Sequence, residues 1–302
     1  MPRTAFAESA WPAGPLHLVR QIGNVCKLRI GVTIAFTALA GIAITPGPSL
    51  ALWQIVVLGL AVLVSSACAG GFNQFVERDL DARMERTRNR PFVTGELNAS
   101  PMWLVGLSAM LVFSVIGAAW ATNMLTAPFV FLGAFFYAVV YTVWLKRRTW
   151  LNIVIGGLAG SFAVLAGATA VDPGISAIPL IFAIVLFLWT PSHFWSLAIV
   201  LHKDYAAAGV PMLPVVVGDR RAAEIILFNS ILLVAISLLP LLYGMGWIYF
   251  LGAALGGLYF LQKNVQLVKN PSPKIAKASF HASLIQLTCM LLAGILDAQL
   301  LG

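Results

Sequence analysis

Amide and acidic side chains recur at helical spacing directly after an apolar run. Asn73, Glu77 and Asp81 stand four residues apart in the sequence. If the helix of the apolar run continues for two more turns, the three side chains share one face, because a helix turns by about 100° per residue. Asp79 then points to roughly the opposite side. Amide and carboxylate oxygens are the hard ligands that bind Mg²⁺ together with substrate phosphates.

The same stretch is also rich in arginine. Residues 73–97 read NQFVERDLDARMERTRNRPFVTGEL and hold five of the eleven acidic residues of the chain and five of its nineteen basic ones. Guanidinium groups bind phosphate through bidentate contacts. Arginines at the end of a membrane helix often serve only to set its orientation. That role gives no reason for the Asn-x3-Glu-x3-Asp pattern, which favours a site for a metal ion and a phosphate.

The composition is that of a polytopic membrane protein. Of the 302 residues, 60% are hydrophobic and 10% are charged, whereas soluble domains carry about 25% charged residues. The mean hydropathy is +0.91. Because the apolar spans leave no room for a soluble domain, the net charge of +8 does not indicate a nucleic-acid partner, and none is expected.

Nine apolar runs are long enough to cross a membrane as helices. The sequence therefore predicts an all-α polytopic membrane protein with about nine transmembrane helices. Residues 1–28 would form a cytoplasmic N-terminal segment, and residues 29–302 a single nine-helix domain. The expected spans are 29–45, 51–73, 101–121, 125–145, 151–171, 178–201, 223–243, 246–262 and 279–300.

The basic residues all fall on one side of these spans. With the N-terminus in the cytoplasm, all nineteen Lys and Arg residues lie in inside segments. This asymmetry follows the positive-inside rule and predicts a cytoplasmic N-terminus and an external C-terminus. The two long inside loops, 74–100 and 202–222, should then lie at the same face of the membrane.

The second long loop offers more carboxylates and cations. Lys203 and Asp204 sit where the sixth span should leave the membrane, and Asp219 follows with Arg220 and Arg221. Because both loops should lie at one face, a helix bundle could bring their acids together across a pocket, with Mg²⁺ bridging them to a diphosphate.

Four segments carry a resemblance to a known family. They are NQFVERDLDARMERTRNRP at 73–91, YTVWLKRRTWLNIVIGG at 141–157, LWTPSHFW at 188–195 and KDYAAAGVPMLPVV at 203–216. On these segments the chain resembles the UbiA-type intramembrane prenyltransferases over about residues 27–300. The first is typical of the superfamily, and the last two are typical of its heme-modifying branch, the protoheme IX farnesyltransferases or heme O synthases. The resemblance implies nine helices around a central cavity in the bacterial inner membrane, with a cytoplasmic-side Mg²⁺–diphosphate site.

The resemblance also implies roles for particular residues. Asn73, Glu77 and Asp81 match the first acidic motif of the family and Asp204 the second, so that these four would bind Mg²⁺ and carry catalysis. The side chains that would hold the diphosphate are Arg86, Arg90, Lys146, Arg147, Tyr141 and Lys203.

A histidine within the sixth span is the candidate for contact with the acceptor. Ionisable residues inside a membrane are functional candidates. His193 could ligate heme iron or orient the porphyrin, with Trp195 packing against the ring. The other interpretation is a neutral histidine that bonds to a neighbouring helix, and the sequence leaves both open.

The implied reaction is the Mg²⁺-dependent transfer of a farnesyl group from farnesyl diphosphate to a vinyl group of protoheme IX (heme B), which gives heme O and diphosphate. Mg²⁺, Arg90 and Lys146 would stabilise the charge that grows on the leaving diphosphate. Prenyl diphosphate, heme and membrane lipid are the expected partners. Downstream partners would be heme A synthase or oxidase assembly factors.

Three positions depart from the family pattern. Glu77 stands where the superfamily usually has Asp. Ala208 replaces a second acid four residues after Asp204, so metal binding there would lean on Asp219 or on water. The fifth span, AGSFAVLAGATAV, lacks the Pro-Pro and Gly-Trp usual in heme O synthases, which keeps open an aromatic or other lipid acceptor. A transporter or a non-catalytic heme-binding assembly protein is the remaining alternative, and the gathering of acids at one face argues against a transporter.

Overall fold

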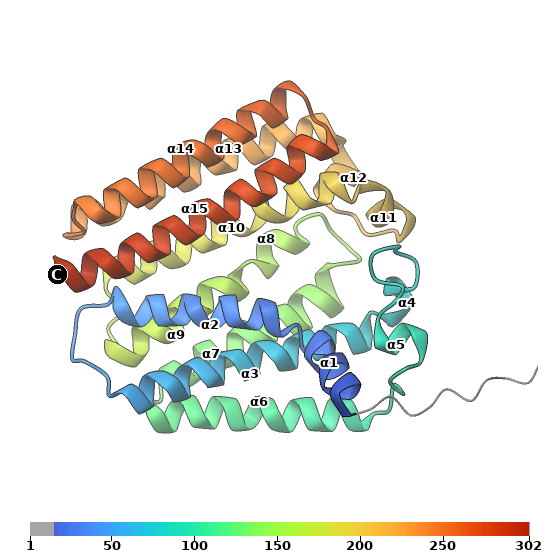
Figure 1. The fold of residues 1–302 in the computed structure, drawn as a ribbon, viewed down its shortest axis with the longest axis horizontal. Helices are drawn as coiled ribbons and strands as arrows, with labels where there is room; N and C mark the ends of the chain where they lie inside the picture. Colours follow the sequence, from blue (N-terminus) through green and yellow to red (C-terminus); the bar gives the residue numbers. More distant parts are fainter. Residues whose placement is uncertain (1–14, 302) are drawn as a thin grey trace, which may run out of the picture.

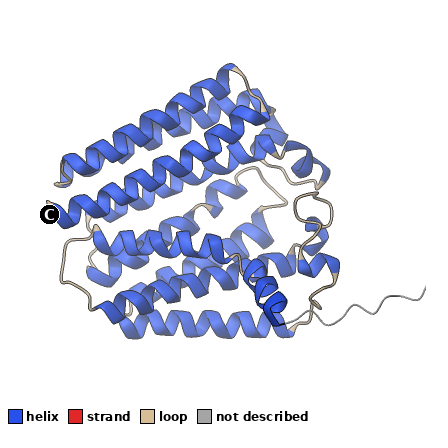
Figure 2. Ribbon diagram, viewed as in Figure 1, coloured by secondary structure: helices blue, strands red, loops and turns tan. Residues whose placement is uncertain are grey.

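The computed structural model describes residues 15–301, and within that range the chain consists only of helices and loops (Figure 2). The prediction of an all-α fold is confirmed. Residues 1–14 of the expected N-terminal segment lie outside the described residues. The long helices are α1 Pro15–Val25, α2 Leu28–Ala43, α3 Leu52–Val76, α6 Met102–Ala121, α7 Thr126–Phe135, α9 Leu158–Val171, α10 Ala177–Val200, α13 Asp219–Ser237, α14 Trp247–Lys269 and α15 Pro273–Leu300. The others are α4 Arg78–Asp81, α5 Pro91–Thr94, η1 Phe136–Leu145, α8 Asn152–Gly156, α11 His202–Ala207, α12 Leu213–Val217 and η2 Leu239–Tyr243.

The predicted number of nine spans is not confirmed. Within residues 15–301, seven helical segments are long and apolar enough to cross a membrane, and the bent pair α1–α2 raises the number to at most eight. The eighth predicted span, 246–262, lies in α14. This helix has 23 residues, but it is not one of the seven segments. The reason is that polar side chains such as Gln262, Lys263 and Asn264 occupy its second half. The seven segments are Leu52–Val76, Met102–Ala121, Thr126–Leu145, Asn152–Val171, Ala177–Val200, Asp219–Tyr243 and Pro273–Leu300.

The short helices that follow α3 and α10 gather at one end of the bundle. In Figure 1, α4, α5, α11 and α12 lie together at the right, and the C-terminus lies at the left. The loops that follow α3 and α10 therefore share one end, which agrees with the prediction that both long loops lie at the same face. Which side of the membrane this polar end faces stays a prediction.

Two glycines allow α2 and α9 to pack with their backbones in contact. A Cβ atom at Gly41 would collide with the carbonyl oxygen of Val164, and one at Gly167 would collide with that of Ala38. Small residues at helix interfaces permit this close approach in membrane proteins, where packing and not water exclusion drives association. The predicted fifth span, which the structure forms as α8 and α9, thus packs closely against α2 through α9.

The segment after α7 is wound as a π-helix over ten residues, η1. Its i→i+5 pattern continues to Lys146, whose backbone N–H donates to the Tyr141 carbonyl at 2.9 Å. π-helical turns are rare and occur frequently at functional sites. η1 brings the chain to the polar end of the bundle beside the end of α3.

Candidate functional site

The first acidic motif lies where α3 ends. α3 stops at Val76 and α4 begins at Arg78, so the continuous helix expected there is broken at Glu77. The winding nevertheless continues, because the Glu77 N–H donates to the Asn73 carbonyl at 3.0 Å and the Asp81 N–H donates to the Glu77 carbonyl at 2.8 Å. Asn73, Glu77 and Asp81 are all at most 2% exposed. The three predicted ligands therefore share a buried face.

Each of these three side chains is bonded by a basic side chain of its own. The cations come from three separate parts of the chain: the α1–α2 junction, the end of η1 and the loop before α5. Sequence reasoning found the last two and missed the first. Lys27 Nζ donates to Asn73 Oδ1 at 2.6 Å, Lys146 Nζ to Glu77 Oε2 at 2.5 Å, and Arg90 Nη1 to Asp81 Oδ2 at 2.6 Å.

The π-helical winding of η1 aims three side chains at this face. In an α-helix, Thr142 and Lys146 would point about 140° and about 180° away from Tyr137. The wider turn of η1 instead brings all three to α3 and its neighbours. The Tyr137 hydroxyl accepts a hydrogen bond from Lys27 at 2.8 Å, and Thr142 Oγ1 accepts one from Asn73 Nδ2 at 3.0 Å. Tyr141 stacks on Tyr137 with ring centroids 5.7 Å apart.

An unpaired oxygen shows how this face could accept a metal ion. Glu77 Oε1 is buried and has no hydrogen-bond partner among residues 15–301. A buried carboxylate oxygen without a partner is costly, and a divalent cation would satisfy it. Within the described part of the chain no three His, Cys, Asp or Glu side chains converge tightly enough to hold a metal. The face therefore fits Mg²⁺ through Glu77 and its neighbours, but it is not a preformed carboxylate cluster.

Asp79 and Arg147 form a separate pair at the surface. Two guanidinium nitrogens of Arg147 donate to the two carboxylate oxygens of Asp79 at 2.9 and 2.8 Å. Both side chains are about half exposed, and the hydrogen bonds from Arg147 hold the pKa of Asp79 below its ordinary value. Asp79 points away from the buried face, as expected. Arg147 was predicted to bind diphosphate, but the structure places it in this outer pair.

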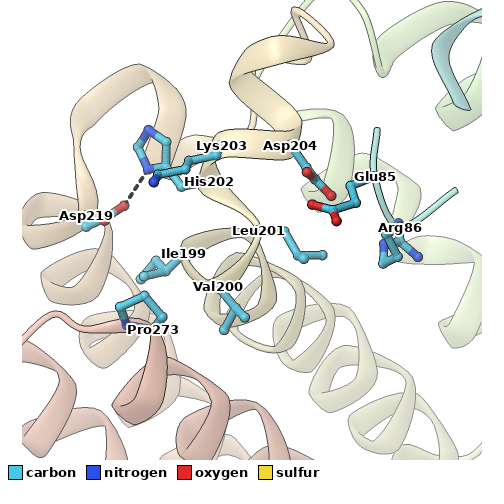
Figure 3. Close-up of a pocket in the computed structure, with 10 residues that line it drawn as sticks. All are labelled: Glu85, Arg86, Ile199, Val200, Leu201, His202, Lys203, Asp204, Asp219 and Pro273. Carbon is cyan, nitrogen blue, oxygen red and sulfur yellow. Dashed lines mark hydrogen bonds and ion pairs between the residues drawn. The ribbon is translucent and has the colours of Figure 1, made fainter. Parts of the chain in front are cut away.

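A cavity of about 740 Å³ opens between the two long loops (Figure 3). Glu85 and Arg86 line it from the first loop, and Lys203 and Asp204 line it from the second. In Figure 3 the carboxylates of Glu85 and Asp204 point toward each other, with Arg86 beside them. Three residues with predicted roles, Arg86, Lys203 and Asp204, therefore share one cavity, and Glu85 is a lining residue that the sequence analysis did not single out.

Asp219 lies on the other side of the same cavity from Asp204 (Figure 3). It is bonded to His202, whose Nδ1 is 2.7 Å from its Oδ1. The expectation that Asp219 would share a metal ion with Asp204 is not supported by this arrangement.

Apolar packing joins the two loops and brings their acids near each other. Leu80 and Met84 of the first loop belong to one buried cluster with Tyr205, Ala208 and Met212 of the second. The apolar Ala208, which replaces an acid of the family pattern, is thus part of this contact. Burial raises the pKa of Tyr205, and charges from both loops act on it: Arg86, Glu77, Arg90 and Asp204.

His193 is held between two aromatic rings. Its ring centroid is 4.2 Å from that of Trp189 and 4.3 Å from that of Phe280, and both pairs are stacked. His193 Nδ1 lies 2.7 Å from Ser283 Oγ, whose hydroxyl donates to the Phe280 carbonyl. The bond to a neighbouring helix that was one of the two interpretations is therefore present. Phe280 and Ser283 of α15 are partners that sequence reasoning missed.

Trp195 is not brought together with His193. It is 3% exposed and belongs to the cluster that joins the two loops. Its ring centroid lies 6.2 Å from that of Trp150. Residues two apart on a helix point about 200° apart, so the two predicted acceptor contacts face different neighbours. The acceptor contact predicted for Trp195 stays a prediction, and the structure does not bring its ring together with that of His193.

The chain is similar to known proteins over most of its length. A family model described as the UbiA prenyltransferase family matches residues 34–287. The chain is 54% identical over 284 residues to "Protoheme IX farnesyltransferase 2" of Paramagnetospirillum magneticum, covering 94% of this chain and 99% of that protein.

Solved structures show a similar fold. One is the structure reported under "Structural and mechanistic insights into the biosynthesis of Digeranylgeranylglyceryl phosphate synthase in membranes". It has a TM-score of 0.75 at 18% identity, covering 93% of this chain and 99% of that one. A UbiA homologue from Archaeoglobus fulgidus bound to DMAPP and Mg²⁺ has a TM-score of 0.71 at 18% identity, covering 90% and 98%. At this identity the likeness concerns the fold alone.

Proposed function

Because the chain belongs to the UbiA prenyltransferase family, we propose that it transfers a farnesyl group from farnesyl diphosphate to a vinyl group of protoheme IX. The products would be heme O and diphosphate. The observation that carries this proposal is the buried face at the end of α3, where an amide and two carboxylates meet three cations. The similarity to a protoheme IX farnesyltransferase over nearly the whole chain supports the choice of acceptor.

At the diphosphate end, the chain supplies ligands and cations. Asn73, Glu77, Asp81 and Asp204 are the residues that would hold Mg²⁺, which neutralises charge on the leaving diphosphate when it is bound. Lys146 and Arg90 now bond to Glu77 and Asp81. If Mg²⁺ takes over those carboxylates, both cations can turn to the phosphate oxygens. Arg86 and Lys203 would reach the diphosphate from the cavity that they line with Asp204.

The bond changes need no protein nucleophile. The C–O bond of farnesyl diphosphate breaks, and its electron pair leaves with the diphosphate. The terminal vinyl carbon of heme supplies the electrons for the new C–C bond. Water then adds its oxygen to the adjacent carbon and releases a proton, which the diphosphate can accept. The role of the chain is to bind both substrates, stabilise the leaving group and keep water away until the C–C bond has formed.

The test of this proposal is the conversion of heme B by the purified protein. With farnesyl diphosphate and Mg²⁺ present, we expect heme B to become heme O, as followed by chromatography and mass spectrometry. Chelation of Mg²⁺ should stop the conversion. If labelled farnesyl is transferred to an aromatic acceptor while heme B stays unchanged, the assignment of the acceptor is wrong.

His193 is proposed to bind the heme iron. The single hydroxyl proton of Ser283 is donated to the Phe280 carbonyl, so Ser283 Oγ must accept from His193 Nδ1–H. The lone pair is then on Nε2, and a hydrogen bond that fixes the opposite nitrogen is typical of histidines that bind metals. We expect His193→Ala to weaken heme binding about tenfold or more, as measured by titration of the Soret band. Binding of farnesyl diphosphate should stay nearly unchanged, because the cations at the end of α3 remain.

The matched control for this prediction is His281→Ala. His281 lies next to Phe280 on α15, but it is exposed and has no stacked partner on both faces. Its removal should leave the heme spectrum as it is. An identical Soret band and affinity in wild type and His193→Ala would exclude iron ligation by His193.

We further propose that the polar end of the bundle faces the cytoplasm of a bacterial inner membrane, with the N-terminus inside and the C-terminus outside. The support is the location of all nineteen Lys and Arg residues in the segments assigned to that face. Residues 29–302 would act as one domain. Farnesyl diphosphate would then enter from the cytoplasmic side, and heme O would pass to a heme A synthase or to oxidase assembly factors.

A further inference from the structure

Helices α1 and α2 meet at a sharp kink centred on Lys27. Their axes are bent by 57°, and Lys27 has a left-handed backbone with φ 49°. A left-handed conformation is unfavourable for a residue with a side chain. Such conformations persist where the surroundings enforce them, and they cluster at functional sites. The conformation of Lys27 is therefore one that its neighbours must enforce.

The end of α3 holds this kink independently of the Lys27 side chain. Gly70 faces the kink so closely that a Cβ atom there would lie 3.1 Å from the Cys26 carbonyl oxygen. One turn further, Gln74 Nε2 donates to the carbonyl oxygens of Asn24 at 2.9 Å and Val25 at 3.3 Å. The two hydrogen bonds from Gln74 satisfy carbonyls at the end of α1. The ammonium of Lys27 is not needed for that purpose.

The Lys27 ammonium differs from the other two cations of the site in its partners. Lys146 and Arg90 each pair with a carboxylate. The hydrogen-bond partners of Lys27 are the neutral Asn73 amide oxygen and the Tyr137 hydroxyl, and its Nζ also lies 5.4 Å from the centroid of the Tyr137 ring. No carboxylate of residues 15–301 forms an ion pair with it.

An unpaired cation at this position suits an anionic ligand. Charges removed from water are normally paired, because desolvation is costly. An ammonium group has three donors, and two of the three are used by Asn73 and Tyr137. The remaining donor is free for an incoming anion. The proposed substrate brings a diphosphate, which carries several negative charges, to the end of α3.

We propose that Lys27 is a third cationic residue of the diphosphate-binding site and that the diphosphate of the substrate is its counter-ion. This inference rests on the proposed function. The kink sets Lys27 against α3 one turn below Glu77, so the three ammonium and guanidinium groups surround the same buried face from three elements. A lysine suits this role because it acts as a compact point charge with rotatable donors.

The test compares variants of Lys27 in the binding of inorganic diphosphate with Mg²⁺, measured by calorimetry on the purified full chain. Lys27→Met removes both the charge and the donors. Lys27→Gln keeps an amide that can still bond Asn73 and Tyr137, but it removes the charge. We expect both to weaken binding about tenfold or more, as for the loss of a charge-assisted hydrogen bond, and Lys27→Arg to stay within about threefold. In turnover assays the KM for farnesyl diphosphate should rise more than kcat falls.

Arg29→Met is the matched control, because Arg29 is exposed two positions after Lys27. It should bind magnesium diphosphate as wild type does. If Lys27→Gln and Lys27→Met lower the unfolding temperature but leave the affinity unchanged, Lys27 only ties the helices together and the inference is wrong. If wild type itself does not bind magnesium diphosphate, the proposed function fails, and the inference fails with it. A loss of binding in Lys27→Arg as large as in Lys27→Met would also contradict a role based on charge.

Discussion

Asp81→Asn is expected to lower kcat roughly 100-fold or more at saturating Mg²⁺ and farnesyl diphosphate. Asp81 is 2% exposed and lies on the face that it shares with Asn73 and Glu77. Asparagine keeps the size and one oxygen acceptor for Arg90, so the loss should report the missing negative charge and not a collapsed site. The measurement is the initial rate of heme O formation, with membrane insertion and unfolding temperature checked in parallel.

Asp79→Asn is the matched comparison for this prediction. It is two residues away, but it is half exposed and paired with Arg147. Exposed ion pairs contribute little to stability, so its turnover should stay within about threefold of wild type. Equal losses in the two variants would mean that the buried face is not where the metal ion binds.

Lys146→Met is expected to lower kcat/KM for farnesyl diphosphate roughly 100-fold. The Lys146 ammonium donates to Glu77 at 2.5 Å on the buried face, where the leaving diphosphate is proposed to bind. Removing it leaves Glu77 with neither of its oxygens bonded, since Oε1 is already without a partner. Steady-state kinetics with varied farnesyl diphosphate will measure the effect.

Arg147→Met provides the neighbouring control. Arg147 follows Lys146 directly, yet its guanidinium bonds the exposed Asp79. Its substitution should change kcat/KM by less than about threefold. A large loss in Arg147→Met together with a small loss in Lys146→Met would reverse the assignment and would restore Arg147 as the residue that binds diphosphate.

Much of the arrangement at the polar end follows from the sequence. The apolar runs predict the helices, since only helices satisfy the backbone of a chain in lipid when no barrel can close. The spacing of Asn73, Glu77 and Asp81 predicts one shared face, and the outward direction of Asp79 follows from the same winding. The placement of both long loops at one end follows from the number of spans between them.

Other parts of the site depend on tertiary contacts that sequence patterns do not carry. Lys27 has no acidic neighbour in the sequence and is indistinguishable from a residue that sets topology. Phe280 and Ser283 meet His193 only because α15 packs against α10. Trp195 and His193 pack against different neighbours, and a position in LWTPSHFW does not say which neighbour each ring faces. The eighth span was counted from the apolar first half of α14, although the polar second half belongs to the same helix.

The π-helical winding of η1 decides which side chains of this segment face the site. Tyr137, Thr142 and Lys146 meet α3 and its neighbours because each turn of this segment holds more residues than an α-helical turn. Winding the same residues as an ordinary α-helix would remove none of the three side chains. It would nevertheless point Lys146 about 180° away from Tyr137. The length of this segment therefore matches its π-helical winding, and a chain with the same residues wound as an α-helix would need another way to place the lysine.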